Sequence, residues 1–136
     1  MLIGVCDDGP LARERLVRSV KESGHEVVAQ VATGAESVNA VKVEQPELIL
    51  LDIRMPEMDG VRCAQILNEL EHPPAIIFVT AYDHYAIAAF KANAIGYLLK
   101  PANKDELIEA LSKASNLNAA QLDGIRKLED PTSRPI

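Results

Sequence analysis

Short apolar segments alternate with amphipathic ones along this chain. Residues 48–51 are wholly apolar and residues 75–80 are apolar up to a final hydroxyl, a pattern typical of strands buried on both faces. The segments between the strands carry apolar residues at helical spacing and end near glycine or proline. We therefore expect strands at 2–6, 26–32, 48–51, 75–80 and 96–99, and helices near 10–24, 33–45, 61–70, 85–94 and 103–115.

Local signals mark the starts of several of these helices. Pro10 stands at the first position of the first helix, where the missing N–H costs nothing. Thr33 and Glu36 have the spacing of a capping box, and Asn103 and Glu106 repeat it. These signals support the helix starts that the apolar spacing predicts.

Regular alternation of strands and helices predicts an α/β domain of three layers, with parallel strands joined by right-handed crossovers. The 136 residues suffice for one domain with its own core and are too few for two of ordinary size. We expect the domain to span residues 1–115.

The pattern loosens from Asn116 onwards. Leu122, Ile125 and Leu128 could prolong the last helix, whereas residues 130–135 have the proline-containing composition of a linker. We interpret residues 116–136 as a linker towards an output domain that is absent from this chain, which makes the chain look like part of a longer protein.

Polar residues stand where four of the predicted strands end. Asp7 and Asp8 follow the first strand, Asp52 follows the third, Thr80 closes the fourth and Lys100 follows the fifth. The carboxyl ends of parallel strands lie at one edge of the sheet, where ligands bind in folds of this class. The sequence therefore predicts that two or three carboxylates, a hydroxyl and an amine converge there.

This set of groups suits phosphoryl transfer assisted by a metal ion. Clustered carboxylates repel one another unless a cation lies among them, and oxygen ligands with few protein contacts suit Mg²⁺. An ionised aspartate can accept a phosphoryl group covalently, and a hydroxyl and an ammonium can hold the phosphoryl oxygens. The residues thus point to Mg²⁺-assisted phosphoryl transfer onto Asp52.

Residues 1–115 resemble the receiver domain of a two-component response regulator. The matching motifs, in order, are the Asp7-Asp8 pair, LLDIRMPEMDG around Asp52, VTA with Thr80, and YLLKP with Lys100. The resemblance implies a flavodoxin-like, doubly wound sheet of five parallel strands in the order 2-1-3-4-5, the order found in flavodoxin and in chemotaxis receivers.

The resemblance also implies roles for the acidic residues. Asp52 would accept the phosphoryl group from a histidine kinase. Asp8 and Asp52 would bind Mg²⁺ directly, the backbone carbonyl of Arg54 would add a third ligand, and Asp7 would act largely through water. Regulators of this kind are switches controlled by phosphorylation, so we expect no enzyme activity in the ordinary sense.

The remaining site residues are implied in the same way. Thr80 and Lys100 would contact the phosphoryl group, and Tyr97 would be the aromatic residue that switches position. The resemblance, together with the low energy of a cis bond before proline, predicts a cis peptide between Lys100 and Pro101.

A narrower similarity links the chain to regulators with a LytTR-type DNA-binding domain, including the alginate-regulator group. PLARERL at 10–16 and TAYDHYAIAAFKANAIGYLLKP at 80–101 carry it. Gly9 stands where this group usually has an acidic residue after the aspartate pair. Both metal-facing acids remain, so we expect the site to work, while the Mg²⁺ affinity stays open. Arg54 and Tyr82 occupy rim positions that in receivers tune the lifetime of the phosphate.

Other functions are less well supported. A small-molecule phosphatase using Asp52 would place a second acid two residues later, where Arg54 stands. A nucleotide- or flavin-binding module would need a glycine-rich phosphate loop after the first strand, where Asp7 and Asp8 stand. A stand-alone receiver acting by protein–protein contact remains open.

Charge and composition limit the kinds of partner and the cellular locations that this chain is expected to have. A formal net charge of −6 argues against this chain itself gripping nucleic acid, so DNA contact would need the output domain. No membrane span or signal peptide stands out, and two cysteines fall short of a disulfide scaffold. We expect a reduced, cytoplasmic protein in which Cys6, Cys63 and Met55 are packing residues. His25, His72 and His84 have no metal-ligand spacing and are expected at the surface.

The helix at 85–94 is predicted to form part of a dimer interface. It is rich in alanine, carries Ile87 and Phe90, and has few charges to oppose a partner. Phosphorylation would draw Thr80 towards Asp52 and let Tyr97 turn inward. The 85–115 face would then form a symmetric homodimer that brings two output domains together.

Overall fold

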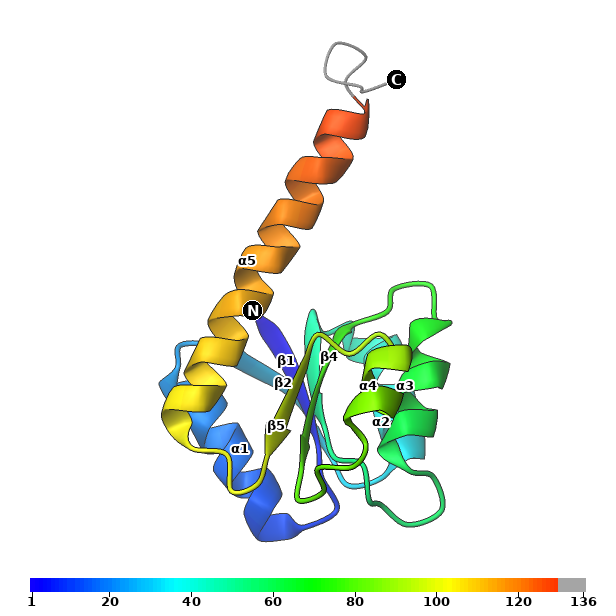
Figure 1. The fold of residues 1–136 in the computed structure, drawn as a ribbon, viewed down its shortest axis with the longest axis vertical. Coiled ribbons are helices and arrows are strands. Elements are labelled where there is room, and N and C mark those ends of the chain that lie inside the picture. The colour runs from blue at the N-terminus through cyan, green and yellow to red at the C-terminus, as the bar shows by residue number, and fades with distance from the viewer. Residues whose placement is uncertain (130–136) are drawn as a thin grey trace.

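Five parallel strands form one sheet with helices on both of its faces (Figure 1). The computed structural model describes the backbone of residues 1–129 and the side chains of residues 1–116, so the linker predicted at 130–136 lies outside the described residues. The strands are β1 (Leu2–Cys6), β2 (Glu26–Val31), β3 (Leu48–Leu51), β4 (Ala75–Thr80) and β5 (Gly96–Leu99). The helices are α1 (Pro10–Glu22), α2 (Gly34–Glu44), α3 (Gly60–Asn68), α4 (Ala86–Lys91) and α5 (Lys104–Glu129).

The strand order is β2-β1-β3-β4-β5, which confirms the predicted flavodoxin-like arrangement. β3 lies between β1 and β4, with Leu50 opposite Val5 on one side and Ile77 on the other. All four residues of β3 are buried, as expected for a central strand covered on both faces.

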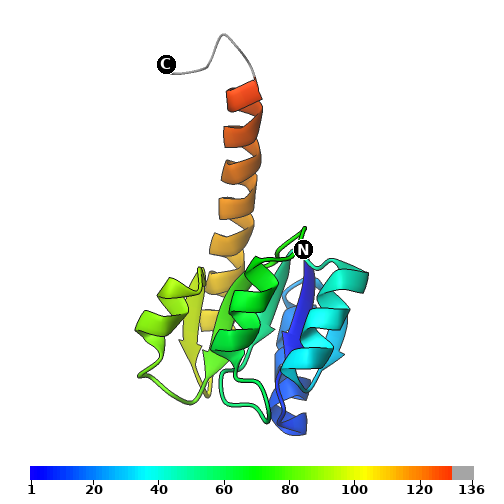
Figure 2. The ribbon, with the colours of Figure 1, turned by 90° about the vertical axis from the view of Figure 1, so that its right-hand side faces the viewer.

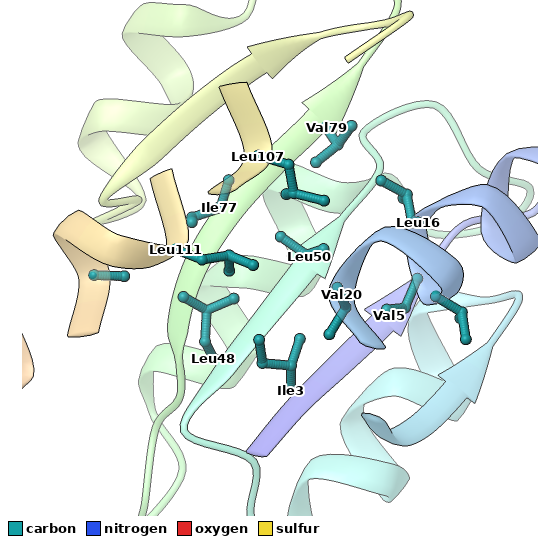
Figure 3. Close-up of a cluster of buried hydrophobic side chains, with 12 residues drawn as sticks. Ile3, Val5, Leu16, Val20, Leu48, Leu50, Ile77, Val79, Leu107 and Leu111 are labelled. Carbon is teal, nitrogen blue, oxygen red and sulfur yellow. The ribbon is translucent and has the colours of Figure 1, made fainter. Parts of the chain in front are cut away.

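Alternate residues of the central strands enter two separate cores, because successive side chains of a strand point to opposite faces. On one face, Leu48 and Leu50 pack with residues of α1 and α5 (Figure 3). On the other face, Ile49 and Leu51 pack with residues of α2, α3 and α4. Figures 1 and 2 show the same division of the helices, with α1 and α5 together on one side of the sheet.

Side-chain caps begin three helices close to the expected positions. The Thr33 side chain accepts a hydrogen bond from the Glu36 N–H at 3.1 Å, and Asn103 Oδ1 accepts one from the Glu106 N–H at 2.7 Å. Asp59 begins α3 by accepting from the Arg62 N–H at 2.8 Å. The capping signals in the sequence therefore mark real helix starts.

Three helix ends differ from the prediction. α4 ends at Lys91 because Asn93 adopts a left-handed conformation with φ 62°, which a continuing helix cannot accommodate. α3 ends at Asn68, ahead of the predicted residue 70. α5 continues to Glu129 and projects beyond the sheet (Figures 1 and 2), since no proline follows until Pro131. Within residues 1–129, no helix has the length and apolarity to cross a membrane.

Candidate functional site

The polar residues at the strand ends gather at one edge of the sheet, as predicted. Asp7 and Asp52 directly follow β1 and β3, Thr80 closes β4, and Lys100 follows β5. Asp7, Asp52 and Thr80 are buried, and they are three of the four buried polar residues in the described part of the chain. Burying polar groups is costly without partners, so their concentration at one edge marks a site.

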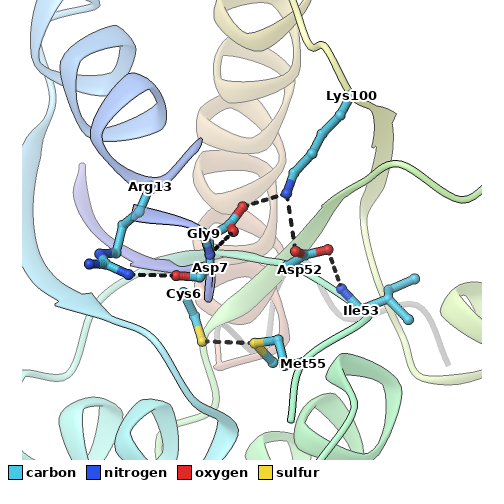
Figure 4. A network of polar contacts seen from close by, with 8 residues as sticks. All are labelled: Cys6, Asp7, Gly9, Arg13, Asp52, Ile53, Met55 and Lys100. Carbon is cyan, nitrogen blue, oxygen red and sulfur yellow. Dashed lines mark hydrogen bonds and ion pairs between the residues drawn. The ribbon is translucent and has the colours of Figure 1, made fainter. Parts of the chain in front are cut away.

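Lys100 joins the two buried acids. Its ammonium lies 2.6 Å from Asp7 Oδ2 and 3.0 Å from Asp52 Oδ2, and its side chain is 24% exposed (Figure 4). The peptide bond between Lys100 and Pro101 is cis, as predicted. Two like charges in one buried site repel each other, and the ammonium between them offsets that repulsion.

Asp52 is fixed on both oxygens and through its backbone. Oδ1 accepts a hydrogen bond from the Ile53 N–H at 2.8 Å, and the Asp52 N–H donates to the Cys6 carbonyl at 3.0 Å. The loop after Asp52 closes tightly, because the Gly60 N–H donates to the Ile53 carbonyl at 2.7 Å. A Cβ on Gly60 would lie 2.0 Å from the Asp52 carbonyl oxygen, so only glycine fits at this position.

The loop after β1 is held by its own hydrogen bonds. Asp7 Oδ1 accepts from the Gly9 N–H at 2.9 Å, and the Asp7 carbonyl accepts from Arg13 Nη1 at 2.8 Å (Figure 4). Arg13 was not among the site residues predicted from the sequence. Its position one turn after the start of α1, where a long side chain can reach back to the preceding loop, is the signal that could have found it.

Three carboxylates are close enough to share one metal ion. Asp7, Asp8 and Asp52 each offer an oxygen, and these oxygens all lie within 4.8 Å of one another. Asp8 is exposed, whereas Asp7 and Asp52 are buried. A set of hard oxygen ligands that is partly open to solvent fits Mg²⁺, which keeps several waters when bound. The role of the Arg54 carbonyl as a further ligand stays a prediction.

Burial and the ion pairs shift two pKa values in this site. Burial raises the pKa of Asp52 and outweighs the opposing effect of the Lys100 ammonium. Burial alone would lower the pKa of Lys100, but the carboxylates of Asp7 and Asp52 outweigh it and raise the pKa. Lys100 therefore stays charged at neutral pH, and a cation bound beside Asp52 would favour its ionised, nucleophilic form.

The Thr80 hydroxyl is buried beside the acids. Its Oγ1 forms no hydrogen bond with any residue that the structure describes. An unpaired buried hydroxyl is costly, and it is available to a ligand oxygen that enters the site.

A cluster of aromatic residues lies at the rim, around the Arg54 side chain. The Arg54 guanidinium lies 4.9 Å from the centre of the Tyr82 ring, and Nη1 is 3.5 Å from the Tyr85 hydroxyl. The His84 ring lies 4.2 Å from that of Tyr85, centre to centre, and His84 is exposed as expected. Tyr97 contacts the same segment by donating a hydrogen bond from its hydroxyl to the Tyr82 carbonyl. Their effects on the lifetime of a phosphate stay predictions.

The structure also places four residues that the sequence predicted to be packing residues or surface residues. Cys6 and Cys63 are fully buried packing residues, and Cys6 Sγ lies 3.5 Å from Met55 Sδ. His25 was expected at the surface but is half-buried, and its Nδ1 lies 2.9 Å from the N-terminal amine.

Comparison with known proteins agrees with this site. The family model for the response regulator receiver domain matches residues 3–112. The chain is 46% identical over 129 residues to the positive alginate biosynthesis regulatory protein of Pseudomonas aeruginosa, covering 93% of this chain and 52% of that protein. It is 31% identical over 120 residues to the sensory transduction protein LytT of Bacillus cereus, covering 88% of this chain and 49% of that protein.

A solved structure shows the same fold. The signal receiver domain of the response regulator NarL from Mycobacterium tuberculosis matches with a TM-score of 0.78 and 35% identity, over 84% of this chain and 95% of that one. The chain spans about half the length of the two regulatory proteins it matches, 52% and 49%. The similarity therefore concerns their receiver portion.

Proposed function

Because this chain belongs to the response regulator receiver domain family, we propose that it accepts a phosphoryl group on Asp52 from a sensor histidine kinase, with Mg²⁺ as cofactor. The observation that carries the proposal is the position of the Lys100 ammonium, 2.6 Å from Asp7 and 3.0 Å from Asp52. A buried acid that is held between a cation and a potential metal site has the surroundings of a phosphoryl acceptor.

The side chains have distinct tasks in the proposed transfer. A carboxylate oxygen of Asp52 attacks phosphorus, the new O–P bond forms as the P–N bond to the kinase histidine breaks, and the histidine nitrogen leaves with the bonding electrons. Lys100 and the Thr80 hydroxyl, which has no partner among the described residues, hold the phosphoryl oxygens.

Asp7, Asp8 and Asp52, with the Arg54 carbonyl, would hold Mg²⁺. The ion would neutralise charge on the transferring group when bound.

The proposed output is control of transcription through a domain outside this chain. Support comes from the two matched regulatory proteins, each about twice as long as the matched segment. Any DNA contact would belong to that further domain, because this chain has a net charge of −6. We place the protein in the cytoplasm, where its kinase would present the phosphoryl group.

The proposal includes a dimer interface on the 85–115 face. Large apolar side chains are exposed there: Ile87, Phe90, Ile95, Leu99 and Ile108. A symmetric pair of receivers would bury this surface and bring two output domains together.

Intact-mass spectrometry after incubation with Mg²⁺ and acetyl phosphate tests the assignment. The parent should gain the mass of one phosphoryl group, and Asp52→Asn should gain none while keeping its circular dichroism spectrum. Unchanged uptake by Asp52→Asn would refute the acceptor. Steady release of inorganic phosphate from many small phosphate esters, without a stable adduct, would favour the phosphatase alternative.

A further inference from the structure

Arg13 contacts the acidic loop from the helix that follows it. Its Nη1 donates a hydrogen bond to the Asp7 carbonyl at 2.8 Å (Figure 4), and its side chain is half-buried. The Asp7 carbonyl lies just beyond the end of β1 at Cys6, where the sheet no longer supplies a partner. The guanidinium therefore satisfies a backbone acceptor that the fold would otherwise leave unpaired.

Asp7 and Asp8 are held in very different ways. The Asp7 N–H donates to the Val31 carbonyl at 3.1 Å, Oδ1 accepts from Gly9, and Oδ2 lies beside Lys100. Asp8 is exposed, and no residue in the described part of the chain donates a hydrogen bond to its carboxylate. The backbone consequently sets where the Asp8 Cα and Cβ lie, and no hydrogen bond to the carboxylate adds to it.

That backbone direction depends on the bond made by Arg13. The Asp7 carbonyl and the Asp8 N–H belong to one planar peptide unit, so a bond that fixes the carbonyl also fixes where the Asp8 Cα lies. On the other side of Asp8, the Gly9 N–H donates to Asp7 Oδ1 at 2.9 Å and the Gly9 carbonyl accepts from the Arg13 N–H at 2.9 Å. The backbone of Asp8 is therefore held from both sides, and the Arg13 guanidinium is the side-chain group that fixes the Asp7 carbonyl.

We propose that Arg13 is a positioning residue of the metal site: its guanidinium orients the Asp7–Asp8 peptide so that the Asp8 carboxylate reaches the ion shared with Asp7 and Asp52. The proposal rests on the proposed function only in taking the ion to be Mg²⁺. Arg13 touches neither the ion nor the phosphoryl group. It acts through the loop, as residues behind the direct ligands do in other metal sites.

Charge and geometry predict opposite effects of removing this arginine. A guanidinium bonded to the acidic loop disfavours a second cation in the same site, so its charge alone would make Arg13→Met bind metal more tightly. If Arg13 orients Asp8, the same substitution weakens binding, by about tenfold as for other residues that orient metal ligands. The sign of the change therefore separates the two roles.

Direct metal binding gives the test, with Mn²⁺ as a probe that prefers the same oxygen ligands as Mg²⁺. Free Mn²⁺ is measured by electron paramagnetic resonance in titrations of the parent, Arg13→Met, Arg13→Lys and Arg18→Met. Arg18 is a matched control on the same helix, paired with Glu14 at 3.8 Å and 65% exposed. We expect Arg13→Met to raise the Kd about tenfold, Arg13→Lys to fall between it and the parent, and Arg18→Met to match the parent.

Equal or tighter Mn²⁺ binding by Arg13→Met would overturn the proposal, as would an equal loss in Arg18→Met. Thermal unfolding without metal shows whether each variant is folded; if Arg13→Met is not, Arg13→Lys and Arg13→Gln carry the same comparison. Phosphoryl uptake by the parent is a separate readout. A parent that binds Mn²⁺ but takes no phosphoryl group would refute the proposed function and leave the role of Arg13 to the titrations.

Discussion

The Lys100 ammonium lies 2.6 Å from a carboxylate oxygen of Asp7, closer than the 3.0 Å that separates it from Asp52. The single positive charge of Lys100 thus offsets part of the repulsion between the two buried acids. A divalent ion in the site would compete with the lysine for the same oxygens.

Replacing this lysine should destabilise the fold and make its stability depend on Mg²⁺. Lys100→Met leaves Asp7 and Asp52 without their cation, at an expected cost of about 3 kcal/mol in the free energy of unfolding. Mg²⁺ should restore part of the loss, because a ligand that binds only the folded state stabilises it. Urea unfolding with and without Mg²⁺ measures both effects.

Lys104→Met is the control for a surface ion pair, since Lys104 meets Glu22 at 2.8 Å with both side chains about half exposed, 51% and 47%. It should cost less than about 1 kcal/mol and respond to Mg²⁺ as the parent does. Equal stabilities for Lys100→Met and Lys104→Met would contradict the bridging role.

Gly60→Ala should be strongly destabilising. The added Cβ would meet the Asp52 carbonyl oxygen at 2.0 Å, and that oxygen is backbone that cannot turn away. We expect a loss of about 3 kcal/mol or more, together with loss of phosphoryl uptake as Asp52 shifts. The comparison is Gly24→Ala. An added Cβ at Gly24 would meet nothing within 4 Å, but the backbone there has φ 86°, which residues with a Cβ rarely adopt. Gly24→Ala should cost only about 1–2 kcal/mol. A Gly60→Ala variant as stable as Gly24→Ala would show that the loop can relax.

The thiol of Cys6 should be inert in the folded protein. Burial, with smaller contributions from Cys63 and the nearby acids, raises its pKa to about 12. Because the thiolate is the reactive form, a disulfide reagent should label neither Cys6 nor the similarly buried Cys63 at pH 8 within minutes. Both should react at once in denaturant. Rapid labelling of the native protein would mean that this core opens readily.

Phosphorylation should strengthen self-association through α4. Sedimentation velocity of the parent with Mg²⁺ and beryllofluoride, a phosphoryl mimic, is expected to show a dimer that Phe90→Ser weakens at least about tenfold. Leu11→Ser is the control, because Leu11 is 71% exposed and Phe90 is 79% exposed, but Leu11 lies on α1. If the mimic binds and no dimer forms, the signal must leave through the segment after Asn116.

Much of the fold follows from local patterns in the sequence, and the failures have physical causes. Residues 48–51 could be assigned to a buried strand because both faces must be apolar. The early end of α4 depends on the left-handed conformation of Asn93, and the length of α5 depends on the absence of a strong helix breaker. Neither feature is strongly indicated by the local amino-acid composition.

The site shows the same limit. The order of strand ends predicts that Asp7, Asp52, Thr80 and Lys100 converge, because parallel topology alone brings them together. It does not predict that Lys100 bridges two acids or that Arg13 reaches back to the Asp7 carbonyl. Those contacts depend on side-chain rotamers in the assembled fold.

The unpaired hydroxyl of Thr80 gives the switch a thermodynamic direction. Its Oγ1 has no partner among the described residues, and a hydrogen bond to a charged oxygen contributes about 1.5–3 kcal/mol. A phosphoryl oxygen on Asp52 would supply that partner only in conformations that bring Thr80 within reach. Since about 1.4 kcal/mol is a tenfold change in population, this one hydrogen bond would favour the conformations that form it by about tenfold or more.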